Sequence, residues 1–265
     1  MADPLIRKPV HAVAFDFFGT LGHWQPGTVG SPAQALYAAA ENRERLDTRH
    51  LVDLVEGLNG SAQFDTEPSP DEYAAWETRT WRAAADYAGV PVTPQLLDEL
   101  REIITRRSLV LYPDVLPALE ALHELGIPWV LCSNASPDVE GKLRTLLPAA
   151  LAPRACAVSC RVGARKPHPR IFAAALRQLR PYDAGQVLFV GDRVDCDVAG
   201  PAAAGFQTAF LDRTAQLSDA PPSGATVSGA PPSGATVSGA TVPGHPHTPV
   251  WRDLQPLAAT LKELS

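Results

Sequence analysis

Five short apolar runs along the chain limit its possible folds more than any other feature of the sequence. They lie at residues 10–17, 128–132, 155–159, 187–190 and 207–211. Each run has the length and continuity of a strand that is buried on both faces of a parallel sheet. Sequence patterns typical of helices precede each of the last four runs, at residues 115–125, 136–147, 169–179 and 198–204. Strands that alternate with helices predict an α/β fold with a doubly wound parallel sheet, in which ligands bind beyond the carboxyl ends of the strands.

Residues 22–109 interrupt this alternation. Amphipathic helical patterns occur there at 32–46, 51–58, 71–88 and 94–107, and no stretch between 22 and 109 is a convincing strand. We expect a helical insertion at 22–109 and a core made of residues 1–21 and 110–265. The third helical pattern carries four aromatic residues, Tyr73, Trp76, Trp81 and Tyr87. Packing within the insertion is the first interpretation of these rings, and lining a substrate cavity is the alternative.

Residues 218–249 are dominated by Pro, Ser, Gly, Ala, Thr and Val, and the decapeptide PPSGATVSGA occurs there twice in succession. Such a segment cannot bury enough surface to offset the entropy of ordering it, which predicts a disordered loop. Residues 250–264 regain an amphipathic pattern that could return to the core, so we expect a loop within the core and not a tail.

Composition excludes several classes of function. The chain has 265 residues and a formal net charge of −6, which leaves no broad basic face and argues against nucleic-acid binding. A small anionic ligand is still compatible with this charge, because one local group of donors can override it. The sequence has no secretory signal pattern and no apolar window of membrane-spanning length, so we expect a cytoplasmic protein without a membrane partner. The four cysteines have no zinc-site spacing and are expected to be reduced and mostly buried. The sequence does not predict an oligomeric state.

Polar residues follow the predicted strands, where a ligand crevice is expected. Asp16 ends the first run and precedes Gly-Thr, and such a carboxylate can be a metal ligand, a general base, a nucleophile or a simple turn cap. Asp192 and Asp197 follow the fourth run. Several carboxylates are costly to bring together without a cation, so a hard metal such as Mg²⁺ is implied.

Two further groups complete the set of candidates. Lys166 is a cation that could balance the carboxylates, and Ser133 with Asn134 supplies a hydroxyl group and amide donors after the second run. Each group alone is a weak signal, but their order and their positions at strand ends resemble the motifs of the haloacid dehalogenase superfamily. The motifs are Asp-x-Asp-Gly-Thr, a Ser or Thr after the next core strand, a Lys, and Gly-Asp-x-x-x-x-Asp. The matching residues are Asp16 and Thr20, then Ser133, then Lys166 in a Lys-Pro-x-x-x-Ile-Phe context that ends at Phe172, then Asp192 and Asp197.

The resemblance implies a role for each matched position. Asp16 would be the nucleophile and a metal ligand, and the backbone carbonyl of Phe18 would be a second ligand. Asp192 would complete the protein ligands of a Mg²⁺ ion, with Asp197 in support. The transferred group of a small anionic substrate would be held by Ser133, Asn134 and Lys166, while Thr20 would orient the loop. The helical insertion resembles the cap of this family.

One position departs from the pattern of the family's phosphatases. They carry a second aspartate two residues after the nucleophile, as acid and base, and this chain has Phe18 there. General acid–base catalysis contributes about 10²–10⁴-fold in rate. A Mg²⁺-dependent phosphatase acting on a small phosphorylated metabolite would therefore need a substrate with a good leaving group or another acid, for which His23 and Asp195 are candidates.

The alternative is a 2-haloacid dehalogenase, because halide leaves without a proton and that branch of the family lacks the second aspartate. It would need an arginine in the insertion to bind the substrate carboxylate, and Arg43, Arg45 and Arg49 are the candidates. The Asp192 to Asp197 loop favours the phosphatase, since a carboxylate cluster needs a cation. A third possibility is a protein that keeps the fold for binding, with weak or lost catalysis.

Overall fold

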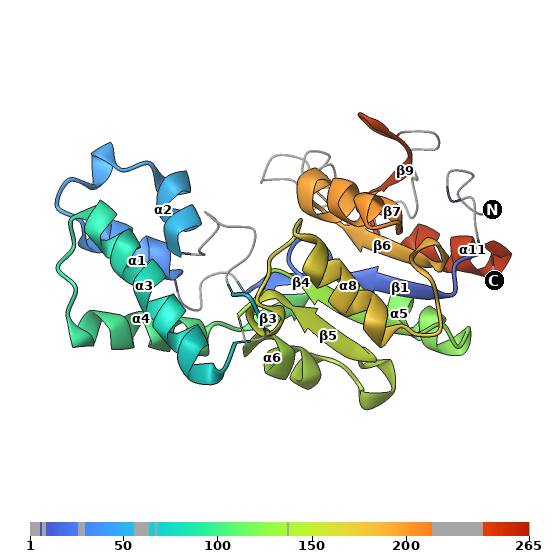
Figure 1. Cartoon of the computed structure of the whole chain (residues 1–265), viewed down its shortest axis with the longest axis horizontal. Helices are drawn as coiled ribbons and strands as arrows, with labels where there is room; N and C mark the ends of the chain where they lie inside the picture. The colour runs from blue at the N-terminus through green and yellow to red at the C-terminus, as the bar shows by residue number, and fades with distance from the viewer. Residues whose placement is uncertain are drawn as a thin grey trace, which may run out of the picture.

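The computed structural model of the chain describes residues 6, 9–25, 30–55, 64–66, 68–136, 138–213 and 241–264. Its centre is a seven-stranded sheet in the order β5-β4-β1-β6-β7-β9-β8 (Figure 1). The strands in this order are Ala155–Val158, Trp129–Ser133, Ala12–Phe15, Val187–Gly191, Gln207–Leu211, His245–Trp251 and Thr241–Val242. All neighbours pair in parallel except β8 and β9, which are antiparallel. The predicted doubly wound α/β sheet is confirmed, and each of the five apolar runs overlaps one of its strands.

Helices cover both faces of the sheet, as the two-residue period of the central strand requires. Val13 and Phe15 of β1 join one apolar cluster, whereas Ala12 and Ala14 join another on the opposite face. The helices of the first face are α5 (Val115–Glu124), α6 (Asp138–Leu146) and α11 (Gln255–Leu264). The second face is covered by α8 (Pro169–Gln178). The short helices α7 (Ser159–Val162) and α9 (Gly200–Ala203), together with a π-helical turn at Val194–Ala199, lie in the connections.

The C-terminal part of the core differs from the prediction. Residues 214–240 lie outside the described residues, so the prediction of a loop is not tested there. At 241–249 the prediction of disorder is wrong, because β8 and most of β9 lie there and β9 extends the parallel sheet beside β7. The amphipathic pattern at 250–264 is divided between the end of β9 and α11.

In the described part of the insertion four helices follow the first strand and lie together to the side of the core (Figure 1). They are α1 (Pro32–Ala39), α2 (Thr48–Val55), α3 (Pro70–Ala88) and α4 (Pro94–Arg106), with a 3₁₀ turn at Arg43–Arg45. The serines before α1 and α3 form capping boxes, and a proline opens α1, α3 and α4, which fixes where these helices begin. Trp81, Leu51 and Leu100 belong to an apolar cluster separate from both core clusters. This separate cluster supports the division into core and insertion that we propose.

The insertion is joined to the core by a two-stranded antiparallel ribbon. Its strands are β2 (Gly22–Trp24) and β3 (Leu109–Leu111). The expectation that 22–109 contains no strand is therefore wrong at both ends. Each strand has three residues, which is too short for an alternating pattern to stand out in the sequence. No helix in the described ranges has the length and hydropathy that crossing a bilayer requires. The four cysteines form no disulfide, and three of them are buried.

Candidate active site

The carboxylate of Asp16 lies at the carboxyl end of β1, in the centre of the sheet. Its backbone N–H donates to the carbonyl of Val190 at 3.0 Å, so the end of β1 is still held in register with β6. The chain then turns sharply, because the carbonyl of Phe17 accepts from the N–H groups of Thr20, Leu21 and Gly22 at 3.2, 2.8 and 2.9 Å. Asp16 is only 6% exposed. The strand and the turn together fix a nearly buried carboxylate at the edge where ligands bind.

Lys166 bridges two of the predicted carboxylates. Its ammonium lies 2.8 Å from Oδ1 of Asp16 and 2.6 Å from Oδ1 of Asp197. Burial acts to lower the pKa of Lys166, but the attraction of Asp16 and Asp197 outweighs it and the pKa is raised. The lysine therefore remains charged in the folded protein.

Asn134 fixes the backbone at this lysine. Its side-chain carbonyl accepts from the N–H of Lys166 at 2.7 Å, and its amide donates to the carbonyl of Lys166 at 3.1 Å. Both polar atoms of the Asn134 side chain therefore form hydrogen bonds that position Lys166. Asn134 also lines the cavity described below.

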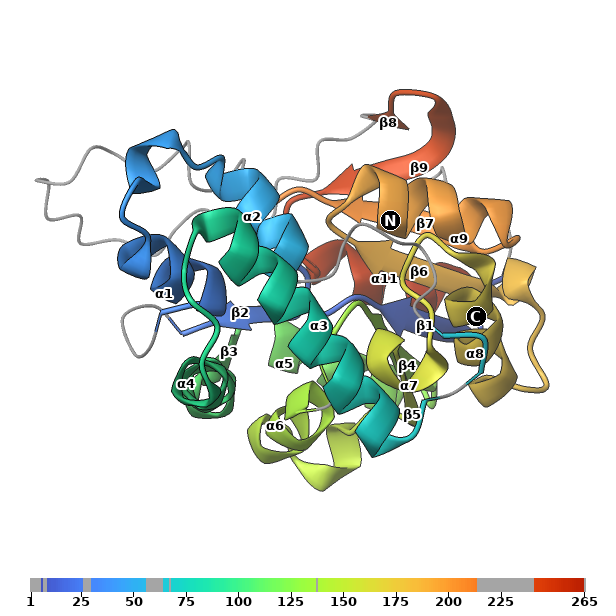
Figure 2. The ribbon, with the colours of Figure 1, turned by 60° about the vertical axis from the view of Figure 1, so that its left-hand side comes forward.

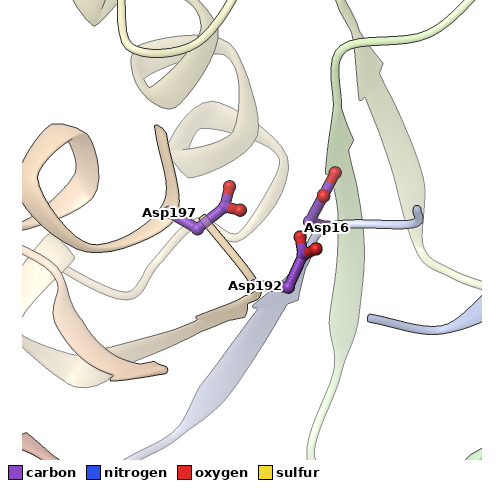
Figure 3. Close-up of side chains that lie close together, drawn as sticks. All are labelled: Asp16, Asp192 and Asp197. Atoms are coloured by element: carbon purple, nitrogen blue, oxygen red, sulfur yellow. The ribbon is translucent and has the colours of Figure 1, made fainter. Parts of the chain in front are cut away.

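Three aspartates, Asp16, Asp192 and Asp197, form one cluster (Figure 3). Each offers an oxygen within 4.8 Å of the others. Asp197 is fully buried and accepts from Lys166 and from the N–H of Arg193 at 3.0 Å. Oδ1 of Asp192 is buried without a hydrogen-bond partner among the described residues. Burial, together with Asp16 and Asp197, raises the pKa of Asp192 to about 7, against the opposing effect of Lys166. The cluster holds more negative charge than one ammonium can neutralise.

A cavity of about 440 Å³ extends from this cluster to the helices of the insertion. On the core side it is lined by Asp16, Ser133, Lys166 and Asp192, and on the insertion side mainly by residues of α1, α2 and α3. Figure 2 shows α3 crossing in front of the core sheet in that view. The hydroxyl groups of Ser133 and Thr20 are buried and have no hydrogen-bond partner within the described part of the chain. Ser133 can therefore donate to a group that enters the cavity.

A family model described as haloacid dehalogenase-like hydrolase matches residues 10–205. The chain belongs to this family of hydrolases. The resemblance inferred from the motifs is thereby confirmed, and the match runs from the strand that carries Asp16 to beyond the Asp192 loop.

Two curated relatives of this haloacid dehalogenase-like hydrolase are phosphatases. A phosphoserine phosphatase of Thermus thermophilus is 33% identical over 162 residues, which make up 57% of this chain and 62% of that protein. A glyceraldehyde 3-phosphate phosphatase of Methanopyrus kandleri is 32% identical over 104 residues, or 38% of this chain and 43% of that protein. The hydrolase spans less than two thirds of the length of either relative.

Solved structures with the same fold include both kinds of enzyme. A 2-haloacid dehalogenase of Pseudomonas syringae pv. tomato aligns with a TM-score of 0.59 and 23% identity, over 97% of this chain and all of that one. A haloacid dehalogenase-family phosphatase of Thermococcus onnurineus aligns with a TM-score of 0.54 and 19% identity, over 95% of this chain and 98% of that one. At such identities the likeness shows the fold alone, so it does not choose between the two reactions.

Phe18 lies beside Asp16 in the wall of the hydrolase's cavity. Its ring contacts that of Trp24, with centroids 5.1 Å apart and planes tilted by 36°. The guanidinium of Arg107, the residue after α4, lies 3.9 Å from the centroid of the Trp24 ring. The position of the family's second aspartate is therefore occupied by an aromatic wall that cannot supply a proton.

The residues proposed from the sequence as substitutes do not reach the cavity of the hydrolase. His23 contacts Tyr112 and the carbonyl of Trp24, and Asp195 is exposed and paired with Arg193. Neither lines the cavity, and neither do the arginines considered for substrate binding, which are all exposed: Arg43, Arg45 and Arg49.

The cavity is lined instead by charged residues that the sequence interpretation missed. Arg107 comes from the end of the insertion, Arg165 precedes Lys166, and Glu77 lies on α3. The position of Arg165 beside the motif lysine was a usable signal. For Arg107 and Glu77 the facing direction depends on how the insertion packs on the core, which spacing does not give. Three aromatic residues of α3 line the cavity: Tyr73, Trp76 and Trp81. Trp81 also packs within the insertion, and Tyr87 packs there without lining the cavity.

Arg213, a further residue missed in the sequence, supports the loop after Asp16. Its guanidinium donates to the carbonyl of Thr20 at 2.7 and 3.1 Å and to both oxygens of Asp114 at 3.1 and 3.0 Å. Asp114 also accepts from the N–H of Leu254 at 2.7 Å. This buried pair links the turn after Asp16 to the C-terminal part of the core.

Gly19 allows the turn and the Asp192 loop to approach each other. It adopts φ of +75°, and a Cβ placed there would lie 2.0 Å from Oδ2 of Asp192. We expect Gly19→Ala to lower the melting temperature by roughly 2–8 °C, from a left-handed penalty of about 1–2 kcal/mol, and to reduce turnover because Asp192 is displaced. Calorimetry and an activity assay measure both effects.

Gly126→Ala is the matched control, since Gly126 has φ of +66° and a Cβ added to it would meet no atom within 4 Å. It should show the loss of stability without the loss of turnover. Equal turnover in the two variants would contradict the assigned role of Gly19.

Proposed function

We propose that the protein is a Mg²⁺-dependent phosphatase that acts on a small phosphorylated metabolite through a phosphoryl group carried transiently by Asp16. The observation that carries this proposal is the cluster of three aspartates with a single lysine bridging two of them. A buried carboxylate oxygen without a partner, as on Asp192, is unstable unless a cation or a proton accompanies it.

The donor set fits Mg²⁺. This ion takes oxygen ligands, binds through few protein carboxylates and keeps several waters. Asp16 and Asp192 would be the carboxylate ligands, the carbonyl of Phe18 a third protein ligand, and Asp197 would support them through Lys166. When bound, the ion would offset the charge of the phosphoryl group and of the nucleophile.

The residues of the chain supply the remaining functions of a phosphoryl transfer. Asp16 is fixed at the strand end with one oxygen 2.8 Å from the ammonium of Lys166, which orients the other for attack. Lys166 and the free hydroxyl of Ser133, which are both buried, would bind the phosphoryl oxygens. Both curated relatives are phosphatases, which supports this choice of reaction.

A 2-haloacid dehalogenase is the second candidate, favoured by the aromatic wall of Phe18 and Trp24. Halide departs without a proton, so an apolar surface beside the nucleophile suits that reaction. Arg107 or Arg165, and not the three arginines considered from the sequence, could bind the substrate carboxylate in the cavity. The unpartnered Asp192 oxygen has no use in a metal-independent reaction, which is why this candidate ranks second.

Purified protein assayed with alkyl phosphates, acyl phosphates and 2-haloacids, each with Mg²⁺ and with a chelator, separates the candidates. The proposal expects phosphate release that the chelator abolishes. Halide release that is insensitive to the chelator would establish the dehalogenase instead. A complete lack of turnover would favour a binding protein with this fold.

Binding of Mg²⁺ should also increase the free energy of unfolding of the protein. At a free concentration of about 100 times the dissociation constant, the ion should add about 2.7 kcal/mol to the free energy of unfolding. Asp192→Asn should remove this gain, because the ion loses a ligand. Thermal unfolding with and without the metal measures the effect, and an unchanged gain in the variant would contradict the assigned ligand.

Without metal, the wild type and Asp192→Asn should differ in how their stability depends on pH. The pKa of Asp192 rises from 3.8 to about 7 on folding, so ionisation favours the unfolded state between these values. As pH rises from about 4 to about 7, the metal-free wild type should lose stability relative to Asp192→Asn. If the stability of the two proteins changes with pH in parallel, folding does not raise the pKa of Asp192.

A further inference from the structure

Phe18 leaves the proposed phosphatase without the acid that an ordinary phosphate ester needs. An alkoxide leaving group is strongly basic, so its departure needs a proton in the transition state. The two substitutes suggested by the sequence, His23 and Asp195, do not line the cavity. The acid should therefore be sought among the side chains that do.

The described residues of the cavity wall include three carboxylic acids, Asp16, Asp192 and Glu77, and no histidine. Asp16 and Asp192 belong to the aspartate cluster, which leaves Glu77. Burial raises the pKa values of Tyr73 and Cys196, the other weak acids of this wall, far above neutral. Neither can give and regain a proton readily at physiological pH.

Glu77 is presented by α3, the helix of the insertion that crosses in front of the core (Figure 2). Two neighbours of Glu77 on this helix, Tyr73 and Trp76, also line the cavity, one turn or less before it. Tyr73 packs against the core cluster, so this part of α3 lies next to the core. The side chain of Glu77 is half-buried, and within the described ranges its carboxyl group has no hydrogen bond or ion pair. It is therefore free to exchange a proton with a molecule in the cavity.

The charges around Glu77 are few and come from neighbouring elements. Arg101 of α4 acts on it as a cation, while Asp138 at the start of α6 acts as an anion, and Tyr73 shares its wall. Arg107 lines the same cavity. Burial is the largest effect and raises the pKa of Glu77 to about 7, although Arg101 opposes it. A carboxyl group of this kind is half-protonated near neutral pH, which suits proton transfer in both directions.

We propose that Glu77 is the catalytic acid and base of this enzyme, in the role that Phe18 cannot fill; the inference rests on the proposed phosphatase activity. As the bond from phosphorus to the leaving oxygen breaks and the bond to an Asp16 oxygen forms, protonated Glu77 gives its proton to the leaving oxygen, directly or through one water. The Glu77 carboxylate then takes a proton from the water that attacks phosphorus. This attack breaks the bond to Asp16 and releases phosphate.

Glu77→Gln tests this role through the leaving group. For an alkyl phosphate, the variant should lose about 10²–10⁴-fold in kcat, because the amide cannot donate the proton. For an acyl phosphate, whose leaving group departs as a stable carboxylate, formation of the phosphoryl-enzyme measured in a single turnover should change less than about threefold. In the wild type, kcat for the alkyl phosphate should fall as pH rises above about 7, and this limb should be absent from the variant.

Glu99→Gln is the matched control, because Glu99 is an exposed carboxyl of α4 that does not line the cavity. It should leave both substrates and the pH profile unchanged. Equal losses of Glu77→Gln in the formation of the phosphoryl-enzyme from the two substrates, a change confined to KM, or no loss at all would overturn the assignment. Failure of the wild type to release phosphate from either ester would instead refute the phosphatase activity on which the inference rests.

Discussion

Asp16→Asn is expected to lower turnover by about 10⁴-fold or more while the protein remains folded. Loss of the nucleophile removes the covalent route, and single substitutions of nucleophiles in other hydrolases have effects of this size. The amide is nearly isosteric, and Lys166 retains its contact with Asp197 at 2.6 Å. Steady-state kinetics and the thermal unfolding curve of the variant measure the two quantities.

A matched control for this variant is Asp86→Asn, which alters an exposed carboxylate of α3. It should keep turnover and stability close to those of the wild type, because Asp86 is exposed and does not line the cavity. A folded Asp16→Asn protein with ordinary turnover would show that this carboxylate is not the nucleophile.

Lys166→Met should cause the largest loss of stability among the site substitutions, about 3–5 kcal/mol in the absence of metal. The ammonium contacts Asp16 and Asp197, and all three side chains are nearly or fully buried. Removing it leaves the negative charges of two buried side chains, Asp16 and Asp197, without compensation. The loss should shrink at low pH, because protonation of the carboxylates relieves their repulsion, and denaturant titrations at several pH values measure it.

Two further variants make this expectation specific. Lys166→Met combined with Asp197→Asn should recover part of the lost stability, since one uncompensated charge is removed. Lys142→Met changes a less buried lysine that pairs with Asp138 and donates to the carbonyl of Ile104, and it should cost less, about 1–2 kcal/mol. Similar losses for the two lysine variants would contradict the account of a buried, bridging ammonium.

The core of the fold could be predicted because its strands are buried on both faces. Such strands appear as continuous apolar runs, and the polar residue that ends a run is placed by the sheet itself. Asp16, Ser133, Lys166 and Asp192 therefore converge in the structure as the sequence suggested. Strand β9 was missed because its sequence, HPHTPVW, contains two prolines and has no apolar run.

The other side of the cavity could not be predicted in the same way. Helical period identifies which face of α3 or α4 is apolar, but the direction in which Glu77 or Arg107 points depends on how the insertion packs on the core. Arg213 meets the carbonyl of Thr20 across 193 residues of sequence, a separation at which no local pattern operates. Long-range packing, and not local propensity, decides these positions.

The covalent step on Asp16 can be measured directly by a single turnover in heavy-oxygen water, followed by mass spectrometry of the peptide that contains this residue. We predict a transient phosphoryl adduct on Asp16, with the heavy oxygen appearing in the released phosphate and not in the aspartate. Heavy oxygen in the Asp16 side chain after reaction with a 2-haloacid would contradict this result, because it would place the attack of water on an ester carbon and identify a dehalogenase.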